Sequence, residues 1–582
     1  MRMRYRKNMM NTIKQNLEAH IQKHILPADI VFSAPPNSVL GDFAFPCFSY
    51  AKTRGESPAI VAKHLAAKIH ADITEASLIR DVRAEGPFVN FFLNQKEMAS
   101  LLFPLILHKT EQPYGAVREE KRKKIMVEFA HPNTHKMFHI GHLRNIVTGE
   151  SIIRILENAG HELVRVNYQG DVGMHIAKSL WGIQQLIDEY RAVQEKDIHE
   201  RMAFLGKAYA RGGQRYEDNE ETKQEIIALN KKIYANDPSI HDIYQTTRSW
   251  SLEYFDIIYQ RVGSRFDRLY FESEVFARGE ELVRAFLKKG VFKESDGAII
   301  FPGETYGLHD RVFITSQGFP GYEAKEMALG ALQFAEHHPD QIIHVVGKEQ
   351  TGYFQVVFKA LEHVVPESMG KEYHLVYGWV HLKHGKMSSR TGNVVLGEEL
   401  LDAVKDRIRA IMKENTVKDA EGVLETVALS AVKYGFLKTG IGNDIAFDME
   451  ESVNISGDSG PYLLYIVARI QSIIRKIQKE NVSAPFDALD GDTLETAQEK
   501  KLLLDLASFP EAAKEAADHL DPSKIAKYLL ELAQDFNAFY HACPVLTADK
   551  ATKSFRIHLV SAVGIVMRHG LYLLGMTHVE EM

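Results

Sequence analysis

Two histidines on either side of a glycine are the residues whose types and spacing most directly suggest chemistry. His139, Gly141 and His142 follow a mostly apolar run at 125–129 that predicts a strand, and they precede an apolar pattern with helical spacing. The first turn of a helix offers unpaired N–H groups and a partial positive charge, which favour a phosphate. A glycine lets a flat ring or a phosphate approach the backbone, and histidines donate hydrogen bonds to developing negative charge. The pattern predicts a nucleotide-binding turn.

Other interpretations of these residues are weaker. A histidine pair at a helix start also serves as a cap or lies on the surface. His135 and His139 are four residues apart, as in zinc proteases, but Lys136 stands where that motif needs glutamate and Pro132 favours a loop. Further downstream, a Gly-Lys-Met-Ser run suggests a phosphate loop, but Val380 stands where that pattern needs its first glycine.

A second stretch, Lys386-Met387-Ser388-Ser389-Arg390, is basic and serine-rich, which by itself is typical of a solvated loop. Together with the histidine turn, it resembles the paired nucleotide-binding motifs of class I aminoacyl-tRNA synthetases, His-Ile-Gly-His and Lys-Met-Ser-Lys. Serine replaces the second lysine, which leaves Lys386 as the phosphate-binding cation. The resemblance implies an α/β fold with a Rossmann-like, doubly wound parallel sheet. It also implies that ATP is bound by His139, Gly141, His142, Lys386, Met387, Ser388 and Ser389.

The residues around both motifs are similar to one family in particular, the arginyl-tRNA synthetases. The similarity covers almost the whole chain and involves several motifs at once. The residues that carry it are Glu128-Phe129, Pro132-Asn133, Lys136 and the run from His139 to Arg144; Asn167-Tyr168 with Gly170, Asp171 and Gly173; the run from Ala431 to Tyr434; Gly460-Pro461-Tyr462 with Tyr465 and Arg469; and residues 570–582.

The arginine-binding residues of the family carry over by position onto Glu128, Asn133 and Gln350. Its Thr-Tyr-x-x-Arg/Lys-Asp segment is matched by Tyr322, an aromatic wall for the guanidinium, and by Glu326, which replaces the usual aspartate. The chemistry suits this ligand, because a guanidinium is planar, always charged and best held by carboxylates and an aromatic face. Two carboxylates, from Glu128 and Glu326, would reject citrulline and disfavour lysine, since a wrong ligand leaves buried charges unpaired.

The activity that the resemblance implies is that of an arginine–tRNA ligase. ATP and L-arginine form arginyl-adenylate, and arginine then passes to the 3′ end of tRNA-Arg with release of AMP and pyrophosphate. His139, His142 and Lys386 are the expected catalytic residues, and Mg²⁺ is expected to neutralise phosphate charge. The alternatives are a lysine- or cysteine-specific synthetase, a small-molecule nucleotidyltransferase with the same histidine turn, and an inactive tRNA-binding protein.

The composition is that of an ordinary globular chain, with 45% hydrophobic and 25% charged residues among 582. A net charge of −7 confines any nucleic-acid surface to a local patch. Cys47 and Cys543 are too few for a four-cysteine zinc site and fit a reducing compartment, so no resident metal is expected. The basic start at 1–7 leads into no apolar core, and the apolar run at 101–107 is too short to span a bilayer. We expect a cytoplasmic protein that does not enter a membrane.

Three units are predicted along the chain. Residues 1–115 resemble the family's additional N-terminal domain, which is associated with the tRNA corner. Residues 120–400 form the expected catalytic domain, with a helical insertion at about 182–262, and residues 401–582 an all-α anticodon-binding domain. Strands of the catalytic domain are expected at 163–167, 297–301, 312–314, 341–347 and 374–379.

Aromatic and basic side chains occur together in the predicted C-terminal helices. Tyr462, Tyr465 and Arg469 are expected to bind tRNA, because aromatic faces stack on unpaired bases and arginine holds phosphates. The partners expected are tRNA-Arg, L-arginine and ATP, and the protein is expected to be a monomer.

Overall fold

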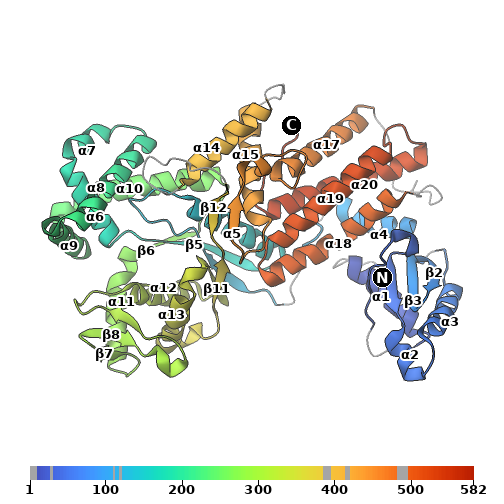
Figure 1. Ribbon diagram of the computed structural model, residues 1–582, viewed down its shortest axis with the longest axis horizontal. Coiled ribbons are helices and arrows are strands. Elements are labelled where there is room, and N and C mark those ends of the chain that lie inside the picture. Colours follow the sequence, from blue (N-terminus) through green and yellow to red (C-terminus); the bar gives the residue numbers. More distant parts are fainter. Residues whose placement is uncertain are drawn as a thin grey trace.

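A computed structural model describes residues 9–25, 30–75, 77–108, 112–116, 121–383, 395–412, 420–480 and 496–582. Its centre is a five-stranded parallel sheet with the strand order β11-β10-β4-β5-β6 (Figure 1). The chain steps outward from β4 through β5 to β6, then returns to build β10 and β11 on the other side of β4. The topological switch point therefore lies between β4 and β10, where loops diverge and leave a crevice. The strands are β4 (Lys124–Glu128), β5 (Glu162–Gln169), β6 (Arg268–Phe271), β10 (Gln341–Gly347) and β11 (Glu372–Tyr377).

Alternate residues of the central strands enter two different cores, as a parallel sheet covered on both faces requires. In β4, Val127 packs into the core that includes α5 (Ile140–Asn158), whereas Met126 packs into the core formed with α11, α12 and α13. The same alternation places Ile343 and Ile342 of β10 on opposite faces. The second core is covered by α11 (Glu272–Leu287), α12 (Tyr322–His337) and α13 (Thr351–Val364).

The segment expected as a helical insertion is helical and forms a separate lobe beside the sheet (Figure 1). Each helix buries one apolar stripe against its neighbours and exposes a charged face. Its helices are α6 (Met174–Gln185), α7 (Ile187–Val193), α8 (Ile198–Asp218), α9 (Glu220–Tyr234) and α10 (Pro238–Arg261).

The strands expected at 297–301 and 312–314 do not join the central sheet. They correspond to β8 (Ala298–Phe301) and β9 (Arg311–Ile314), which pair with β7 (Lys293–Ser295) in a separate antiparallel sheet. The strand β6, with only four residues, was not predicted from the sequence and supplies one edge of the central sheet.

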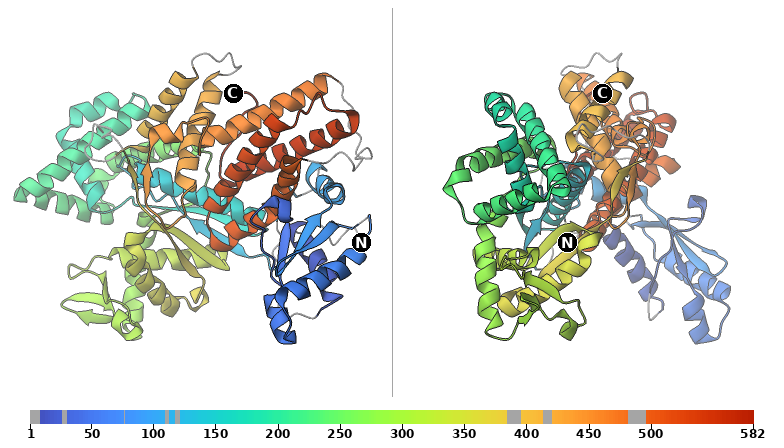
Figure 2. Two further views of the ribbon diagram at one scale, coloured as in Figure 1. Left: turned by 45° about the vertical axis from the view of Figure 1, so that its right-hand side comes forward. Right: turned by 60° about the vertical axis from the view of Figure 1, so that its left-hand side comes forward.

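The N-terminal domain is a three-stranded antiparallel sheet covered by helices, and it packs against the C-terminal helices, away from the lobe formed by α6–α10 (Figure 2). Asp42 links the two domains: its Oδ2 accepts a hydrogen bond from Leu93 N at 2.8 Å and its Oδ1 lies 2.7 Å from Lys500 Nζ. The elements are α1 (Met9–Gln22), β1 (Phe43–Pro46), α2 (Phe48–Arg54), α3 (Pro58–Ala71), β2 (Ile79–Glu85), β3 (Phe88–Leu93) and α4 (Gln95–Leu107).

The chain after residue 395 is mainly helical. A short parallel pair, β12 (Val380–Leu382) with β13 (Ile445–Phe447), joins it to the domain that contains the central sheet. None of the helices in the described ranges is long and apolar enough to cross a membrane. The helices are α14 (Gly397–Ile411), α15 (Ala420–Leu437), α16 (Met449–Ser452), α17 (Gly460–Lys479), α18 (Ala497–His519), α19 (Ser523–Ala542) and α20 (Lys550–Leu573).

Candidate active site

A cavity of about 360 Å³ lies at the carboxyl ends of β4, β5 and β10, which is the switch point of the sheet. Its size is in the range of small-molecule sites. Most of the residues that the sequence assigned to arginine and ATP meet here. The predicted residues that line it are Glu128, Asn133, His139, Gly141, His142, Glu326 and Gln350.

The two histidines of the turn are fixed as neutral hydrogen-bond donors. Nδ1 of His139 accepts hydrogen bonds from Gly141 N and His142 N, at 3.1 and 3.4 Å, and Nδ1 of His142 accepts from His139 N at 3.2 Å. Because Nδ1 of each ring is an acceptor, the proton of each neutral ring is on Nε2. The rings stack with their centroids 3.6 Å apart. The backbone that caps α5 therefore also sets the tautomer of both histidines.

The environment keeps both rings uncharged at neutral pH. Burial, and then the charge of Lys136, lowers the pKa of His139 to about 4. Burial and the proximity of His139 place the pKa of His142 well below its ordinary value. A neutral donor stabilises charge that develops on a phosphate without carrying a fixed charge that would hold the product equally well.

The loop that connects β4 to the histidine turn has an unusual backbone. Ala130, His131 and His135 have φ values of 79°, 50° and 62°, a left-handed conformation that side chains with a Cβ seldom adopt. Two asparagines hold this loop: Asn145 Oδ1 accepts from Ala130 N at 2.7 Å, and Asn167 Oδ1 accepts from His131 N at 3.2 Å. The strain is thus compensated by buried side-chain amides.

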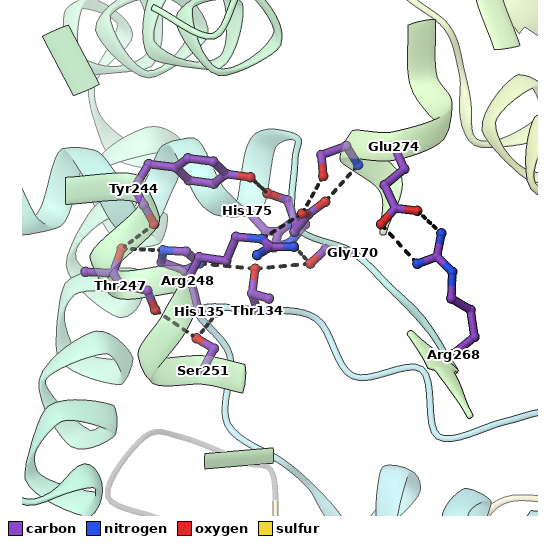
Figure 3. Close-up of polar contacts among 12 residues, drawn as sticks. Thr134, His135, Gly170, His175, Tyr244, Thr247, Arg248, Ser251, Arg268 and Glu274 are labelled. Atoms are coloured by element: carbon purple, nitrogen blue, oxygen red, sulfur yellow. Dashed lines mark hydrogen bonds and ion pairs between the residues drawn. The ribbon is translucent and has the colours of Figure 1, made fainter. Parts of the chain in front are cut away.

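A second set of contacts joins this loop to the helical insertion (Figure 3). His135 N donates to Ser251 Oγ at 2.9 Å, and His135 Nε2 lies 2.7 Å from Thr247 Oγ1 on the same helix, α10. The carboxylate of Asp171, which is fully buried, accepts a hydrogen bond from Arg248 Nε at 2.8 Å. It also accepts hydrogen bonds from the backbone N–H and the side-chain hydroxyl of Ser273. The lobe formed by α6–α10 is therefore tied directly to the wall of the cavity.

Glu128 and Glu326, which line the cavity, belong to a cluster of carboxylates around a buried histidine. His344 Nδ1 lies 3.1 Å from Glu128 Oε1, and His344 Nε2 lies 2.7 Å from Glu372 Oε2. The other oxygen of Glu128 accepts from Gln333 Nε2 at 2.5 Å. A neutral imidazole has one donor, so bonds to two carboxylates indicate an imidazolium. We describe Glu128, Glu326, His344 and Glu372 together as the acidic cluster.

The charges within the acidic cluster oppose one another. Burial lowers the pKa of His344, but the two carboxylates outweigh it, and the net pKa lies well above the ordinary value. Burial raises the pKa of Glu128, but the charge of His344 outweighs burial and the net pKa is lowered. Burial, and then the charge of Glu128, raises the pKa of Glu326 to about 8. Glu326 is therefore the carboxyl whose charge depends on what enters the cavity.

The acidic cluster also has the outline of a metal site. Glu128, Glu326 and His344 each present one potential ligand atom, and these atoms lie within 4.8 Å of one another. Both nitrogens of His344, however, already bind carboxylates, and an imidazolium has no lone pair for a metal. The hydrogen-bonding pattern fits an organic cation better than a metal ion.

Tyr322 is one predicted residue that the structure does not bring to the cavity. Its side chain is 66% exposed, and Lys325 Nζ lies over its ring at 4.4 Å from the centroid. Lys325 in turn pairs with Glu272, at 2.8 Å, and Glu272 lines the cavity. The predicted role of Tyr322 as the wall of the guanidinium pocket stays a prediction.

Residues Lys386, Met387, Ser388 and Ser389 lie outside the described residues, but the segments on either side of them are described. Trp379 and Val380, upstream, line the cavity. Downstream, Ile140 N donates to Val395 O at 2.9 Å, and Gly397 N donates to Phe138 O at 2.8 Å. The described residues before that segment therefore lie at the cavity, and those after it lie at the histidine turn.

Arg144, on the first turns of α5, binds the backbone just before β12 and β13. Its guanidinium donates to four backbone carbonyls, those of Gly378, Trp379, Ile441 and Asn443. The residue is 1% exposed, and burial lowers its pKa to about 10. This buried arginine holds together the two chain segments that lead into β12 and β13.

The three residues predicted to bind tRNA lie on α17. Tyr462 is 7% exposed, so its ring lies within the helical core. Tyr465 and Arg469 are partly exposed: Arg469 binds Tyr465 Oη and Asn537 Oδ1, and its guanidinium also covers the ring of Tyr540 at 4.8 Å. Of the three, Tyr465 and Arg469 are the ones with surface to offer a nucleotide, and the assignment stays a prediction.

Several residues that build the site had not been singled out for these roles in the sequence. His344 lies in the apolar run Ile342–Val346 and looked like a residue of a strand interior. A polar residue in a fully buried parallel strand is the signal that could have found it. Asn145 lies one helical turn after His142 and, within the helical pattern, looks like a solvent-facing residue. Its amide bonds to Ala130 N and Val345 O instead bridge β4 and β10.

Comparisons with known proteins agree with this geometry. Residues 104–449 match the family model "tRNA synthetases class I (R), catalytic domain", residues 463–582 match "DALR anticodon binding domain", and residues 7–93 match "Arginyl tRNA synthetase N terminal domain". A parallel sheet with the histidine turn at its switch point, and a match over the catalytic domain, define a class I aminoacyl-tRNA synthetase.

Whole-chain relatives narrow this class. The chain is 34% identical to the arginine–tRNA ligase of Treponema pallidum subsp. pallidum over 566 residues, with 95% of each chain covered. It is 30% identical to that of Clostridium perfringens, with 100% of each covered. The solved structure of Thermus thermophilus arginyl-tRNA synthetase has a TM-score of 0.77 at 25% identity and covers 98% of this chain and 100% of its own. This chain belongs to the arginyl-tRNA synthetase family.

Proposed function

We propose that this chain activates L-arginine with ATP to arginyl-adenylate and transfers arginine to the 3′ end of tRNA-Arg, with release of AMP and pyrophosphate. The observation that supports this most strongly is that one cavity is lined both by the neutral histidine donors, at what we call its histidine end, and by Glu128 and Glu326 of the acidic cluster, at what we call its acidic end. The first end suits a nucleotide and the second an organic cation. Their union in one cavity is what activation of a cationic amino acid requires.

The chemistry proceeds without a side-chain nucleophile. The arginine carboxylate attacks the α-phosphate of ATP in line, a bond forms between that oxygen and phosphorus, and pyrophosphate leaves. His139 and His142 donate from Nε2 to the phosphates as charge develops, and Gly141 lets the nucleotide lie against the turn. Lys386, with Met387, Ser388 and Ser389, is assigned to the leaving phosphates. The adenylate then loses its arginyl group to the terminal hydroxyl of tRNA.

We propose that Mg²⁺ binds together with ATP. The lining of the cavity includes Glu349, an oxygen ligand of the kind that Mg²⁺ prefers alongside phosphate oxygens, so the residues present fit the ion. When bound, Mg²⁺ neutralises phosphate charge and orients the triphosphate. The protein residues would hold that complex against the turn.

Glu326 and Glu128 have different roles in the proposed recognition of arginine. Glu326 faces the cavity without a hydrogen bond or ion pair to another described residue, so we assign it the guanidinium. Glu128 carries the second negative charge but is already held by His344 and Gln333. Asn133 and Gln350 also line the cavity and are assigned to the rest of the amino acid, and Tyr322 to its outer side.

The remaining assignments concern the domains. We propose residues 401–582 as the anticodon-binding unit, with Tyr465, Arg469 and the neighbouring Tyr462 on its tRNA side. Residues 1–115 would contact the tRNA corner, and 120–400 carry the chemistry. We also propose that the protein is a monomer of the cytoplasm, which suits its two buried, unpaired cysteines.

The decisive experiment is an aminoacylation screen of all twenty amino acids against total tRNA. Charging with arginine alone is the expected result, and charging with lysine or cysteine would overturn the assignment. No charging under single-turnover conditions would favour an inactive tRNA-binding protein or a small-molecule nucleotidyltransferase, and a gel shift with bulk tRNA would separate these two. Pyrophosphate exchange with and without tRNA-Arg then tests whether activation needs tRNA.

A further inference from the structure

The hydroxyl of Tyr168 is a buried polar group at the cavity with no hydrogen-bond partner among the described residues. The residue lies near the end of β5, beside the switch point of the sheet. By contrast, the hydroxyl of the buried Tyr259 is satisfied, because it accepts hydrogen bonds from Asn167 and Gln169. An unpaired buried hydroxyl is costly, so its presence at a binding cavity points to a partner supplied by a ligand.

The surroundings of this hydroxyl decide which ligand fits. Burial raises the pKa of Tyr168 well above its ordinary value, and the nearby carboxylates of Glu272, Glu326 and Glu128 raise it further. The phenol therefore stays protonated, and its oxygen keeps lone pairs free to accept. An anion would be repelled by the same carboxylates. A cation with several N–H groups would meet both a carboxylate and this oxygen.

The neighbouring carboxylates are not equally available. Glu272 pairs with Lys325 at 2.8 Å, and Glu128 binds His344 and Gln333. Glu326 has no such partner among the described residues and lines the cavity with Tyr168. The free acceptors on this wall are therefore the carboxylate of Glu326 and the hydroxyl oxygen of Tyr168.

We propose that Tyr168 is a specificity-determining residue, whose Oη accepts an N–H from the guanidinium that Glu326 holds. This rests on the proposed function. A guanidinium carries five N–H donors in a plane, so one edge can bind the carboxylate while another nitrogen reaches the hydroxyl. The ammonium of lysine has no second nitrogen to reach it. The aromatic residue at the guanidinium is thus Tyr168, from β5, in addition to any contribution from the exposed Tyr322.

The test is the Tyr168→Phe variant, which removes one oxygen and keeps the ring. In aminoacylation at saturating ATP and tRNA, the KM for arginine is expected to rise about 10- to 100-fold, which is the loss of one hydrogen bond to a charged group. The KM for ATP should stay within about twofold, because the histidine turn is untouched. Arginine should also raise the Tm of the variant less than that of the wild type at equal concentration.

A matched control is Tyr114→Phe, because Tyr114 Oη donates to Leu506 O at 2.9 Å, at the contact between the N-terminal region and α18. That variant should lose stability and keep its arginine KM. Tyr168→Phe should keep or gain stability without arginine, since it removes an unsatisfied group. An arginine KM within twofold of the wild type would overturn the inference. Failure of the wild type to charge tRNA with arginine would overturn the proposed function instead.

Discussion

The two ends of the cavity are built in opposite ways. The histidine turn is local: His139, Gly141 and His142 satisfy one another through the backbone, and both rings are neutral. The acidic cluster is assembled from β4, α12, β10 and β11, and in it the buried His344 pairs with Glu128 and Glu372 while the partly buried Glu326 stays unpaired among the described residues. In the proposed function, local hydrogen bonds hold a donor pair for the nucleotide, and a charge network assembled from distant segments selects the amino acid.

This comparison predicts which substitution lowers the activity with arginine most. Replacing Glu326 by Gln removes the free carboxylate, and with it two charge-assisted hydrogen bonds to the guanidinium. We expect kcat/KM for arginine to fall by about 100- to 1000-fold, while the KM for ATP changes little. Steady-state aminoacylation at varied arginine measures this.

A control for that variant lies on the same helix. Glu336 of α12 accepts a hydrogen bond from the hydroxyl of Tyr270 at 2.7 Å. Its side chain is partly exposed and does not line the cavity. Glu336→Gln should therefore leave the arginine KM within about twofold of the wild type. Equal losses in both variants would mean that α12 is perturbed as a whole and that Glu326 has no special role.

Substitutions in the histidine turn should lower kcat. His142→Asn keeps an oxygen able to accept from His139 N but removes the Nε2–H donor. We expect kcat to fall about 100-fold, as for other preorganised donors to a developing charge, with little change in the KM for arginine. His142→Gln, whose amide N–H reaches further, should recover part of the rate. A large rise in the arginine KM with unchanged kcat would contradict the division between the two ends.

The acidic end should respond to pH, and the histidine end should not. Glu326 has a pKa raised to about 8, so below that pH it carries a proton that must leave before it can pair with a guanidinium. The arginine KM of the wild type should fall about tenfold per pH unit as pH rises from 6 towards 8, then level off. The KM for ATP should stay flat, because His139 titrates near pH 4.

The Glu326→Gln variant provides the internal control for this pH dependence, since it has no proton to lose. Its arginine KM should be high and independent of pH across the same range. An arginine KM of the wild type that is constant between pH 6 and 8 would show that Glu326 is already ionised in the free protein.

The difference between the two ends also explains what the sequence could and could not predict. The histidine turn was predictable because its chemistry lies in four consecutive residues after a strand. The pairing of His344 with Glu128 and Glu372 was not, because the three lie on different strands and their side-chain directions depend on the register of the sheet. In the same way, β8 and β9 were identified as strands, but an apolar run does not say which strand it pairs with.

The smallest effect on turnover, and the clearest on stability, should come from His344. Replacing it by Gln leaves Glu128 and Glu372 buried without their cation, a loss of about 3–5 kcal/mol of unfolding free energy for a broken buried pair. Glu372→Gln alone should cost less, because Glu128 remains bound to His344. If the network acts as a unit, the double variant should cost less than the sum of the two single variants, and urea unfolding of the four proteins measures that coupling. Additive losses would mean that His344 and Glu372 stabilise the fold independently. The acidic cluster would then be a set of separate pairs, and recognition of arginine by Glu326 would not depend on the coupling between His344 and Glu372.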